Sequence, residues 1–271
     1  MVLESVNFHF WALCNFKCNY CFARFESNNP NLTSNQCLEI IDNISDALIK
    51  KINFAGGEPT LSPYLGDLLV HSKKLGLVTS IISNGTGINR PFFEKFRKSI
   101  DWIGLSIDSG FEMINFKLGI GNRNIVKQII RKSKIIQDIG IKLKINTVVN
   151  KLNYQEDFSW LIKRINPDRW KAFQILKIKN QQSVKLNDLL ISEAEFEDFV
   201  KNHLYLNPIT ETNQLMLESY LMIDPFGRFY QNTGNSYIFS RPILEVGFKK
   251  ELSDITYDII KYIQRGGLYA W

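Results

Sequence analysis

Short apolar or alternating runs recur along this chain, and segments with helical periodicity separate them. The runs predict strands at 5–13, 51–54, 78–83, 102–106, 143–149 and 170–176. The intervening segments predict helices at about 33–48, 64–75, 91–97, 124–139 and 154–165. Strands that alternate with helices in this way predict an α/β fold, with a parallel sheet and helices on its outside.

The first predicted helix starts at Thr33 and Ser34. Its apolar face consists of Cys37, Ile41, Ile44 and Leu48, which recur at helical spacing. Cys37 is therefore predicted to be a core residue.

The pattern changes after residue 179. A helix is predicted at 193–204, a hairpin at 220–230 around Asp-Pro-Phe-Gly, and a helix at 253–264 that Gly266 and Gly267 stop. We expect residues 1–179 to form the core and residues 180–271 to form a C-terminal extension that closes it and completes the pocket. An independent second domain is not expected.

Several predicted strands carry polar residues on one side only. Side chains alternate along a strand, and the side that faces outer helices must be apolar, so the polar side should face inward. The inward set is predicted to be Asn7, His9, Trp11, Lys51, Asn53, Lys142, Lys144, Asn146 and Lys171. Lysines that face one cavity repel each other without a counter-anion, which implies a polyanionic ligand. Alternatively, these lysines lie at strand starts and reach solvent.

Composition narrows the function classes. The 271 residues are 45% hydrophobic, enough to bury a sizeable core in one large domain. Lys and Arg number 33 against 27 Asp and Glu, an excess that suits an anionic partner, although it is spread along the chain. Nothing in the sequence resembles a membrane span or a signal peptide, so we expect a cytoplasmic protein with no membrane partner.

Three cysteines lie within eight residues, as Cys14-Asn-Phe-Lys-Cys18-Asn-Tyr-Cys21. This density favours a metal centre, and three thiolates would hold a 4Fe-4S cluster with one iron left open for a small molecule. A zinc site would need a fourth ligand at matching spacing, and no histidine of the chain offers one. A disulfide framework would need an oxidising compartment, which nothing in the sequence indicates.

The C-x3-C-x2-C spacing with Tyr20 before the last cysteine resembles that of the radical S-adenosylmethionine (SAM) enzymes. The resemblance implies a partial (β/α)6 barrel, a 4Fe-4S cluster on Cys14, Cys18 and Cys21, and SAM on the open iron. Active sites of barrels lie at the C-terminal ends of the strands. The residues that the resemblance places at SAM are Gly56, Gly57, Glu58, Ser83, Asn84 and Ser106.

Within these enzymes the chain resembles the viperin family, and specifically its soluble microbial members. The matching segments are 5–10, 51–59, 144–146, 166–171, 213–214, 219–221 and 265–267. Viperins convert a nucleoside triphosphate, CTP in animals, to its 3'-deoxy-3',4'-didehydro form, which terminates viral polymerase chains. The residues that the resemblance places at the nucleotide are Asn7, Lys51, Lys144, Asn146, Lys171 and Arg265.

Tyr220 occupies the position proposed in this family to quench the product radical. A tyrosine in an apolar hairpin also commonly serves packing or a structural hydrogen bond. The resemblance further implies CTP as the favoured substrate, with UTP or GTP as alternatives, a flavodoxin or ferredoxin as reductant, and a monomer.

Two positions depart from the family pattern. Ile120 stands where an arginine would contact the triphosphate, and Arg123 is the nearby candidate to replace it. Tyr237 stands where a lysine is expected, and Arg241 is the nearest cation.

Two alternative functions remain. A radical SAM enzyme could act on another metabolite or on a peptide, although peptide-modifying relatives often need further cysteines and none follows Cys37. A nucleic-acid-binding module with a structural metal has only the positive charge and the aromatic residues in its favour.

Overall fold

The computed structural model describes residues 3–25, 32–121, 124–179, 184–234 and 236–270. The strands in this part of the chain join into one ten-stranded sheet in the order β10-β9-β8-β1-β2-β3-β4-β5-β6-β7. Their bounds are β1 (Ser5–Trp11), β2 (Lys51–Gly56), β3 (Val78–Ser83), β4 (Trp102–Ser106), β5 (Lys142–Val149), β6 (Arg169–Gln174), β7 (Ile209–Glu211), β8 (Met222–Ile223), β9 (Arg228–Thr233) and β10 (Ser236–Pro242).

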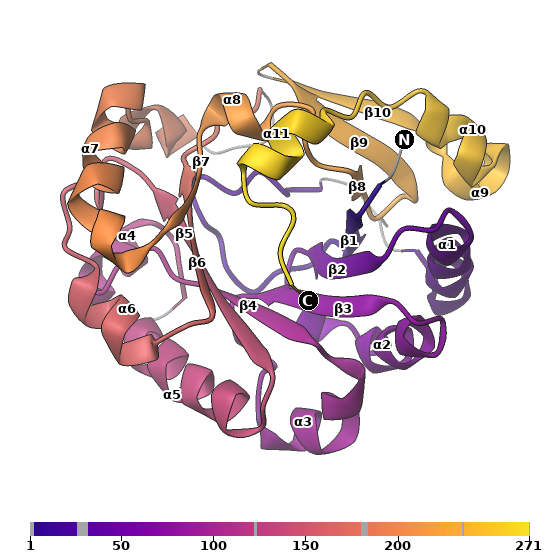
Figure 1. Cartoon of the computed structure of the whole chain (residues 1–271), viewed down its shortest axis with the longest axis horizontal. Coiled ribbons are helices and arrows are strands. Elements are labelled where there is room, and N and C mark those ends of the chain that lie inside the picture. Colours follow the sequence, from indigo (N-terminus) through magenta and orange to yellow (C-terminus); the bar gives the residue numbers. More distant parts are fainter. Residues whose placement is uncertain (1–2, 26–31, 122–123, 180–183, 235, 271) are drawn as a thin grey trace.

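Helices lie around the curved sheet, and most of them are at the periphery in Figure 1. Their bounds are α1 (Ser34–Asp46), α2 (Leu65–Lys74), α3 (Arg90–Phe96), α4 (Glu112–Lys117), α5 (Ile125–Asp138), α6 (Ser159–Ile165), α7 (Glu193–His203), α8 (Asn213–Met216), α9 (Ile243–Val246), α10 (Phe248–Ser253) and α11 (Ile259–Gln264). Strands β1 to β7 run parallel to their neighbours, as the alternation of strands and helices predicts. None of the described helices is long and apolar enough to cross a membrane.

The C-terminal part of the chain adds strands to both edges of this sheet. Strand β7 pairs with β6 at one edge, and β8 pairs in parallel with β1 at the other. The predicted hairpin is β8 and β9, in which Met222 faces Tyr230. The Asp224 carboxylate accepts the backbone amides of Phe226 and Arg228, each at 2.9 Å, and so shapes the turn. Residues 209–242 therefore extend the same sheet as the first half of the chain.

Helix α1 forms where the sequence predicts it. Thr33 and Gln36 form a capping box at its start, and Cys37 is among the residues that it buries. The prediction that Leu48 continues the apolar face is wrong, because Leu48 lies beyond the helix with a φ of 59° and is 82% exposed. Its left-handed conformation lets the next amide, that of Ile49, reach the Ile44 carbonyl at 3.3 Å.

Two other helices differ from prediction. Helix α6 begins at Ser159 rather than near residue 154, because the Asp157 carboxylate accepts the Ser159 amide at 2.8 Å and the chain before it forms turns. The helix predicted at 253–264 forms only from Ile259, as α11, because Ser253 is the last residue of α10 and residues 254–258 separate the two helices. Asp258 caps the second by accepting the Lys261 amide at 2.9 Å.

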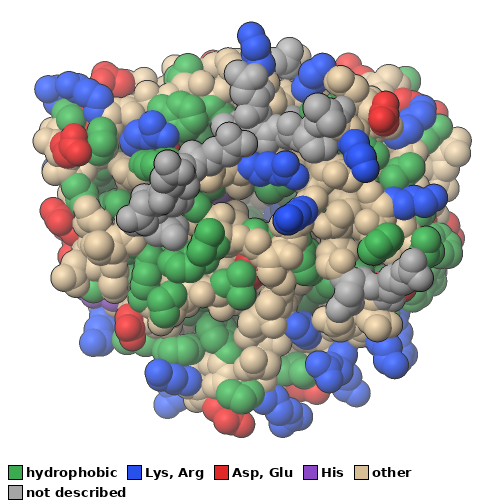
Figure 2. Space-filling view, turned by 180° about the vertical axis from the view of Figure 1, so that it is seen from behind, with side chains coloured by type: hydrophobic (Ala, Val, Ile, Leu, Met, Phe, Trp, Pro, Cys, Tyr) green, Lys and Arg blue, Asp and Glu red, His purple; other side chains and the backbone are tan. Residues whose placement is uncertain are grey.

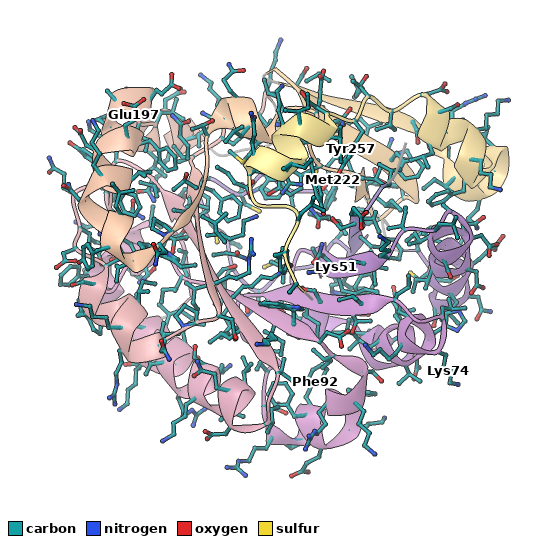
Figure 3. All side chains as sticks on the ribbon, viewed as in Figure 1. Lys51, Lys74, Phe92, Glu197, Met222 and Tyr257 are labelled. Carbon is teal, nitrogen blue, oxygen red and sulfur yellow. The ribbon has the colours of Figure 1, made fainter. Side chains whose placement is uncertain are left out.

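The alternation along the strands sets which residues face inward. On β2, Ile52 and Phe54 are buried in the apolar core, while Lys51 and Asn53 face the centre of the molecule. Figure 3 shows Lys51 and Met222 inside the ring of elements, and Lys74 and Glu197 at its outside.

Two members of the predicted inward set lie elsewhere. Between Phe8 and Trp11, β1 contains an irregularity in its register with β2, so Trp11 leaves the alternation and packs edge-on against Tyr64 at 5.7 Å between ring centroids. Lys142 lies at the start of β5, where it is exposed and forms an ion pair with Asp168 at 3.1 Å.

Candidate active site

A cavity of about 350 Å³ lies on the inward side of the sheet. Side chains from β1 to β6, from the cysteine loop and from the C-terminal segment line it. Figure 2, the view from behind, shows a hollow near the centre of that face with Lys or Arg side chains beside it. Polar groups thus converge on one space from segments that are far apart in the sequence.

Cys14, Cys18 and Cys21 all line this cavity. The loop that carries them is fixed by backbone hydrogen bonds to residues after α4, from Lys17 to the Gly119 carbonyl at 3.2 Å and from Asn19 to the Leu118 carbonyl at 2.9 Å. Cys37, in contrast, is buried in the apolar core on α1, as its helical spacing predicts.

The donor set of this loop fits an iron–sulfur cluster. In the described part of the chain, no group of three His, Cys, Asp or Glu side chains is arranged to hold a single metal ion. A cubane cluster attaches each thiolate to a different iron, so it needs three thiols around one shared space. The three free cysteines of the loop meet that requirement, since all of them face the same cavity. Burial raises the pKa of Cys18 and of Cys21, which favours the thiol unless a cation such as iron is present.

The Gly-Gly turn after β2 lies against the cysteine loop. The Gly57 amide donates to the Trp11 carbonyl at 2.6 Å, and the Glu58 amide donates to the Leu13 carbonyl at 2.8 Å. A Cβ on Gly57 would overlap the backbone of Leu13 and Ala12, so this position requires glycine. Gly56 and Gly57 both line the cavity, and their backbone is therefore available to a ligand beside the cysteines.

Glu58, which is predicted at SAM, is not among the residues that line the cavity. Its buried carboxylate accepts hydrogen bonds from Thr60, from the Ser83 hydroxyl at 2.7 Å and from the Asn84 amide at 2.7 Å. These bonds use both carboxylate oxygens. Glu58 therefore holds the end of β3 against the end of β2 and orients Ser83 and Asn84, which line the cavity.

The other residues predicted at SAM do line the cavity, namely Ser83, Asn84 and Ser106. The Asn84 side-chain amide donates to Asn15 in the cysteine loop at 3.0 Å, so the ends of β3 and β1 meet there. The Tyr20 hydroxyl donates to Asp108, a contact that the sequence did not predict. Burial raises the pKa of Asp108 to about 7.

A second group of cavity residues is cationic. Lys51, Lys144 and Lys171 extend from β2, β5 and β6, as the alternation predicts, and Arg265 follows α11. Lys51 is 1% exposed and Lys144 is 6% exposed, so these two do not reach solvent as lysines at strand starts often do. Asn7 and Asn146 also line the cavity, and the Asn53 side-chain amide donates to the Asn7 side-chain oxygen, Oδ1, at 2.9 Å.

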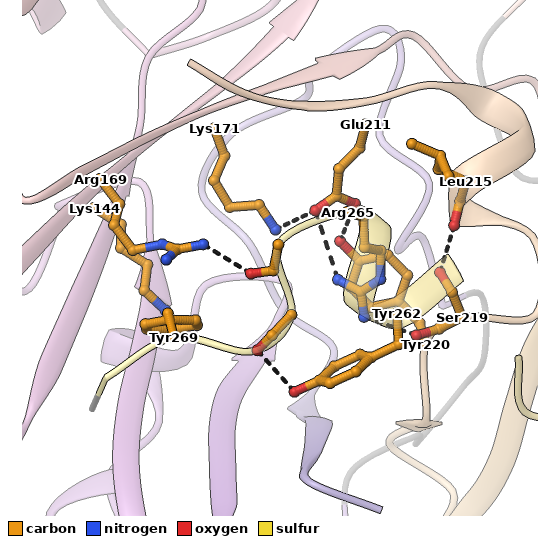
Figure 4. Close-up of polar contacts among 12 residues, drawn as sticks. Lys144, Arg169, Lys171, Glu211, Leu215, Ser219, Tyr220, Tyr262, Arg265 and Tyr269 are labelled. Carbon is orange, nitrogen blue, oxygen red and sulfur yellow. Dashed lines mark hydrogen bonds and ion pairs between the residues drawn. The ribbon is translucent and has the colours of Figure 1, made fainter. Parts of the chain in front are cut away.

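Tyr269 lies between the cations. Lys51 and Lys144 both donate to its hydroxyl. The Arg169 guanidinium lies 3.7 Å from the centre of its ring (Figure 4). Burial lowers the pKa of Lys51 to about 7 and lowers the pKa of Lys144 well below its ordinary value. Their mutual repulsion contributes to the second shift.

Glu211 is the anion of this group. Its fully buried carboxylate forms ion pairs with Lys171 and, at 3.5 Å, with Arg265, and it accepts the Tyr220 hydroxyl (Figure 4). Burial alone would raise the pKa of Glu211, but Lys171 and Arg265 lower it below its ordinary value. Tyr220 itself lines the cavity, so its prediction as a site residue is consistent with its position.

Arg241 and Arg123 are the other two cations predicted at the nucleotide. Arg241 is outside the cavity wall, because its guanidinium pairs with Glu251 at 2.8 Å. Arg123 lies outside the described residues. Ile120 and Tyr237, the two departures from the family pattern, both line the cavity.

Three residues of the cation group were missed in the sequence. Arg169 lies two residues before Lys171 and therefore on the same side of β6, but the predicted strand began one residue too late to include it. Glu211 ends a strand of three residues, too short for an alternation to show. Tyr269 follows the last helix, where no periodic pattern exists to distinguish it.

Comparisons with known proteins identify a superfamily and individual relatives. The sequence model of the radical SAM superfamily matches residues 9–165. A curated S-adenosylmethionine-dependent nucleotide dehydratase of Flammeovirga pacifica is 39% identical over 282 residues, which cover 100% of this chain and 97% of that protein. One of the same name from Lacinutrix mariniflava is 38% identical, and the match covers 99% of this chain and 59% of that protein.

Among solved structures, Streptococcus suis SuiB bound to S-adenosylmethionine is similar with a TM-score of 0.70 and 18% sequence identity. The match covers 96% of this chain and 67% of SuiB. At this identity the similarity shows the fold, which supports the predicted partial barrel.

Proposed function

This chain belongs to the S-adenosylmethionine-dependent nucleotide dehydratases of the radical SAM superfamily, and we propose that its substrate is a nucleoside triphosphate. The product would be the 3'-deoxy-3',4'-didehydro nucleotide, formed by loss of the 3'-hydroxyl as water. The family resemblance predicted from the sequence is confirmed. CTP is the favoured substrate and UTP or GTP are the alternatives.

The observation that carries the proposal is the charge of the cavity beside the cysteines. Its cations are Lys51, Lys144, Arg169, Lys171 and Arg265, and Glu211 is the carboxylate buried against them. When all six are ionised the net charge is positive by four, and a triphosphate carries about four negative charges near neutrality. A polyanion of that size would neutralise the group.

The parts of the site divide by role. Cys14, Cys18 and Cys21 would hold the iron–sulfur cluster, which would supply the electron for reductive cleavage of SAM. Gly56, Gly57, Ser83, Asn84 and Ser106 line the cavity wall next to these cysteines and would bind SAM. The cations fix the triphosphate and so hold the ribose toward SAM. We further propose that a flavodoxin or ferredoxin is the reductant and that the enzyme is a monomer.

Tyr220 is proposed to help complete the reaction. After the 3'-hydroxyl leaves, the sugar holds an unpaired electron that must be reduced before release, and a phenol can deliver a hydrogen atom where a phenyl ring cannot. Burial raises the pKa of Tyr220 well above its ordinary value, so the hydroxyl keeps its proton at neutral pH.

The test of the substrate class is nucleotide binding to lysine variants. Each charge-assisted contact to a phosphate contributes roughly 1.5–3 kcal/mol, so Lys144→Ala and Lys171→Ala should each weaken triphosphate binding about tenfold to a hundredfold. Lys142→Ala is the matched control, because Lys142 lies on the same strand as Lys144 but pairs with Asp168 in solvent. Binding of the nucleoside as tight as that of the triphosphate would eliminate the proposal.

The test of Tyr220 is Tyr220→Phe, which keeps nearly all of the packing. This variant should bind nucleotide and cleave SAM, yet 5'-deoxyadenosine should accumulate faster than didehydro-nucleotide. A wild-type ratio of the two products at the wild-type rate would assign Tyr220 a structural role.

A further inference from the structure

Glu211 links the cations of the cavity to Tyr220. One carboxylate oxygen, Oε1, pairs with the Lys171 ammonium and with the Arg265 guanidinium at 3.5 Å, and the other, Oε2, accepts the Tyr220 hydroxyl. The Glu211 side chain is fully buried on β7. Figure 4 shows these side chains converging from β6, β7 and the segments around α11.

Arg265 completes this cluster. Its guanidinium lies 3.5 Å from the centre of the Tyr220 ring and donates to the Ser219 carbonyl at 2.7 Å. Arg265 therefore covers the ring of Tyr220 while Glu211 holds its hydroxyl. The orientation of the phenol is fixed from two sides.

A carboxylate at this point opposes nucleotide binding. It places a negative charge among the cations that would face a triphosphate, and it occupies Lys171 and Arg265 with an internal partner. A buried carboxylate is also unfavourable in itself unless its partners compensate for its lost hydration. Substrate affinity therefore does not explain why a carboxylate lies here. The other contact of the Glu211 carboxylate is the Tyr220 hydroxyl, which suggests that its role concerns Tyr220.

We propose that Glu211 is a positioning residue that orients the Tyr220 phenol for the product-forming step at the expense of nucleotide affinity. The inference rests on the proposed function, because it concerns the residue proposed to reduce the product radical. It goes beyond that proposal by assigning opposite effects on binding and on product formation to one side chain.

Glu211→Gln separates these effects, since it keeps the size of the side chain and removes its charge. Nucleoside triphosphate binding, measured by calorimetry without turnover, should be as tight as in the wild type or tighter, because Lys171 and Arg265 lose their internal anion. The amount of 5'-deoxyadenosine formed per didehydro-nucleotide should rise roughly tenfold, the effect of replacing a charged hydrogen-bond acceptor by a neutral one. A merely structural role would weaken binding as well.

Two further variants show whether Glu211 acts through Tyr220. Glu211→Gln combined with Tyr220→Phe should have the product ratio of Tyr220→Phe alone, since the phenol to be oriented is absent. Glu211→Asp keeps the charge but withdraws the carboxylate from the hydroxyl, so it should retain wild-type nucleotide affinity and lose the wild-type ratio. Glu251→Gln is the matched control, because Glu251 is a buried carboxylate paired with an arginine outside the cavity.

The outcomes distinguish the inference from the function on which it rests. Weaker nucleotide binding by Glu211→Gln, an unchanged product ratio, or additive effects in the double variant would each overturn the role of Glu211. If the wild-type protein forms no didehydro-nucleotide from any triphosphate, the proposed function fails. The binding arm then still tests whether Glu211 opposes nucleotide affinity.

Discussion

Nucleotide binding should take up protons above neutral pH, because Lys51 is largely uncharged in the free protein. Burial, together with the positive charges of Arg169 and Lys171, lowers the pKa of Lys51 from 10.5 to about 7, while a hydrogen bond with Lys144 opposes the shift. At about pH 8 only about one Lys51 in ten would carry a charge. A bound triphosphate brings negative charge to the ammonium group and so raises the pKa in the complex.

The sign of the pH dependence follows from these two pKa values. The pKa in the complex is above that in the free protein, so the full affinity is present below about pH 7 and is lost as the pH rises toward the pKa of the complex. Within that window each pH unit weakens binding by about 1.4 kcal/mol, a factor of about ten, for one lysine. Lys144, whose pKa is also lowered by burial, contributes in the same direction. The terminal phosphate has lost its last proton well below about pH 8, since its pKa is about 6.

The assay is titration calorimetry at about pH 8 in two buffers that differ in ionisation enthalpy, which reports the number of protons exchanged. We expect an uptake of about one proton or more by the wild type. Lys51→Met should take up fewer protons and show a flatter pH dependence. Lys50→Met is the control, because Lys50 is the adjacent residue but pairs in solvent with Glu4 at 3.1 Å. Uptake near zero in the wild type, or unchanged in Lys51→Met, would refute the account of the cation group.

Two further predictions concern the cysteine loop. Cys14→Ala, Cys18→Ala and Cys21→Ala should each abolish anaerobic iron–sulfur absorption and SAM cleavage, whereas Cys37→Ala should keep both because Cys37 lies in the core; full absorption in any of the first three would contradict the assignment. Gly57→Ala should push the cysteine loop away, because the added Cβ would overlap the loop backbone. We expect the free energy of unfolding to fall by about 1–3 kcal/mol and less cluster to be incorporated. An unchanged melting temperature and iron content would contradict this prediction.

The strands and the inward lysines could be predicted because both depend on strong local signals. The apolar side of β2 and β5 packs in the core, so their polar side must face the cavity. Lys51, Lys144 and Asn146 can therefore be predicted from alternation alone. Trp11 fails the same rule because the register irregularity in β1 shifts it, and an irregularity of that kind leaves no mark in the hydrophobic pattern. Lys142 fails because the start of β5 extends beyond the cavity, where Lys142 pairs with Asp168 in solvent.

The residues that could not be predicted depend on tertiary contacts. Glu211 and Tyr269 lie in segments without periodicity, and each gains its role only because the chain returns to the cations of distant strands. Glu58 illustrates the converse, since a sequence motif places it near SAM while its carboxylate is used by Ser83 and Asn84. Motif spacing therefore located the site, and the contacts revealed how its parts support one another.

The most direct test of the central claim is anaerobic turnover of the reduced wild-type protein with SAM and each of the four nucleoside triphosphates, with products identified by mass. The account predicts 5'-deoxyadenosine together with a nucleotide lighter by one water, and little of either when the nucleoside replaces the triphosphate. The account would be contradicted if 5'-deoxyadenosine formed while each of the four triphosphates was recovered without loss of water.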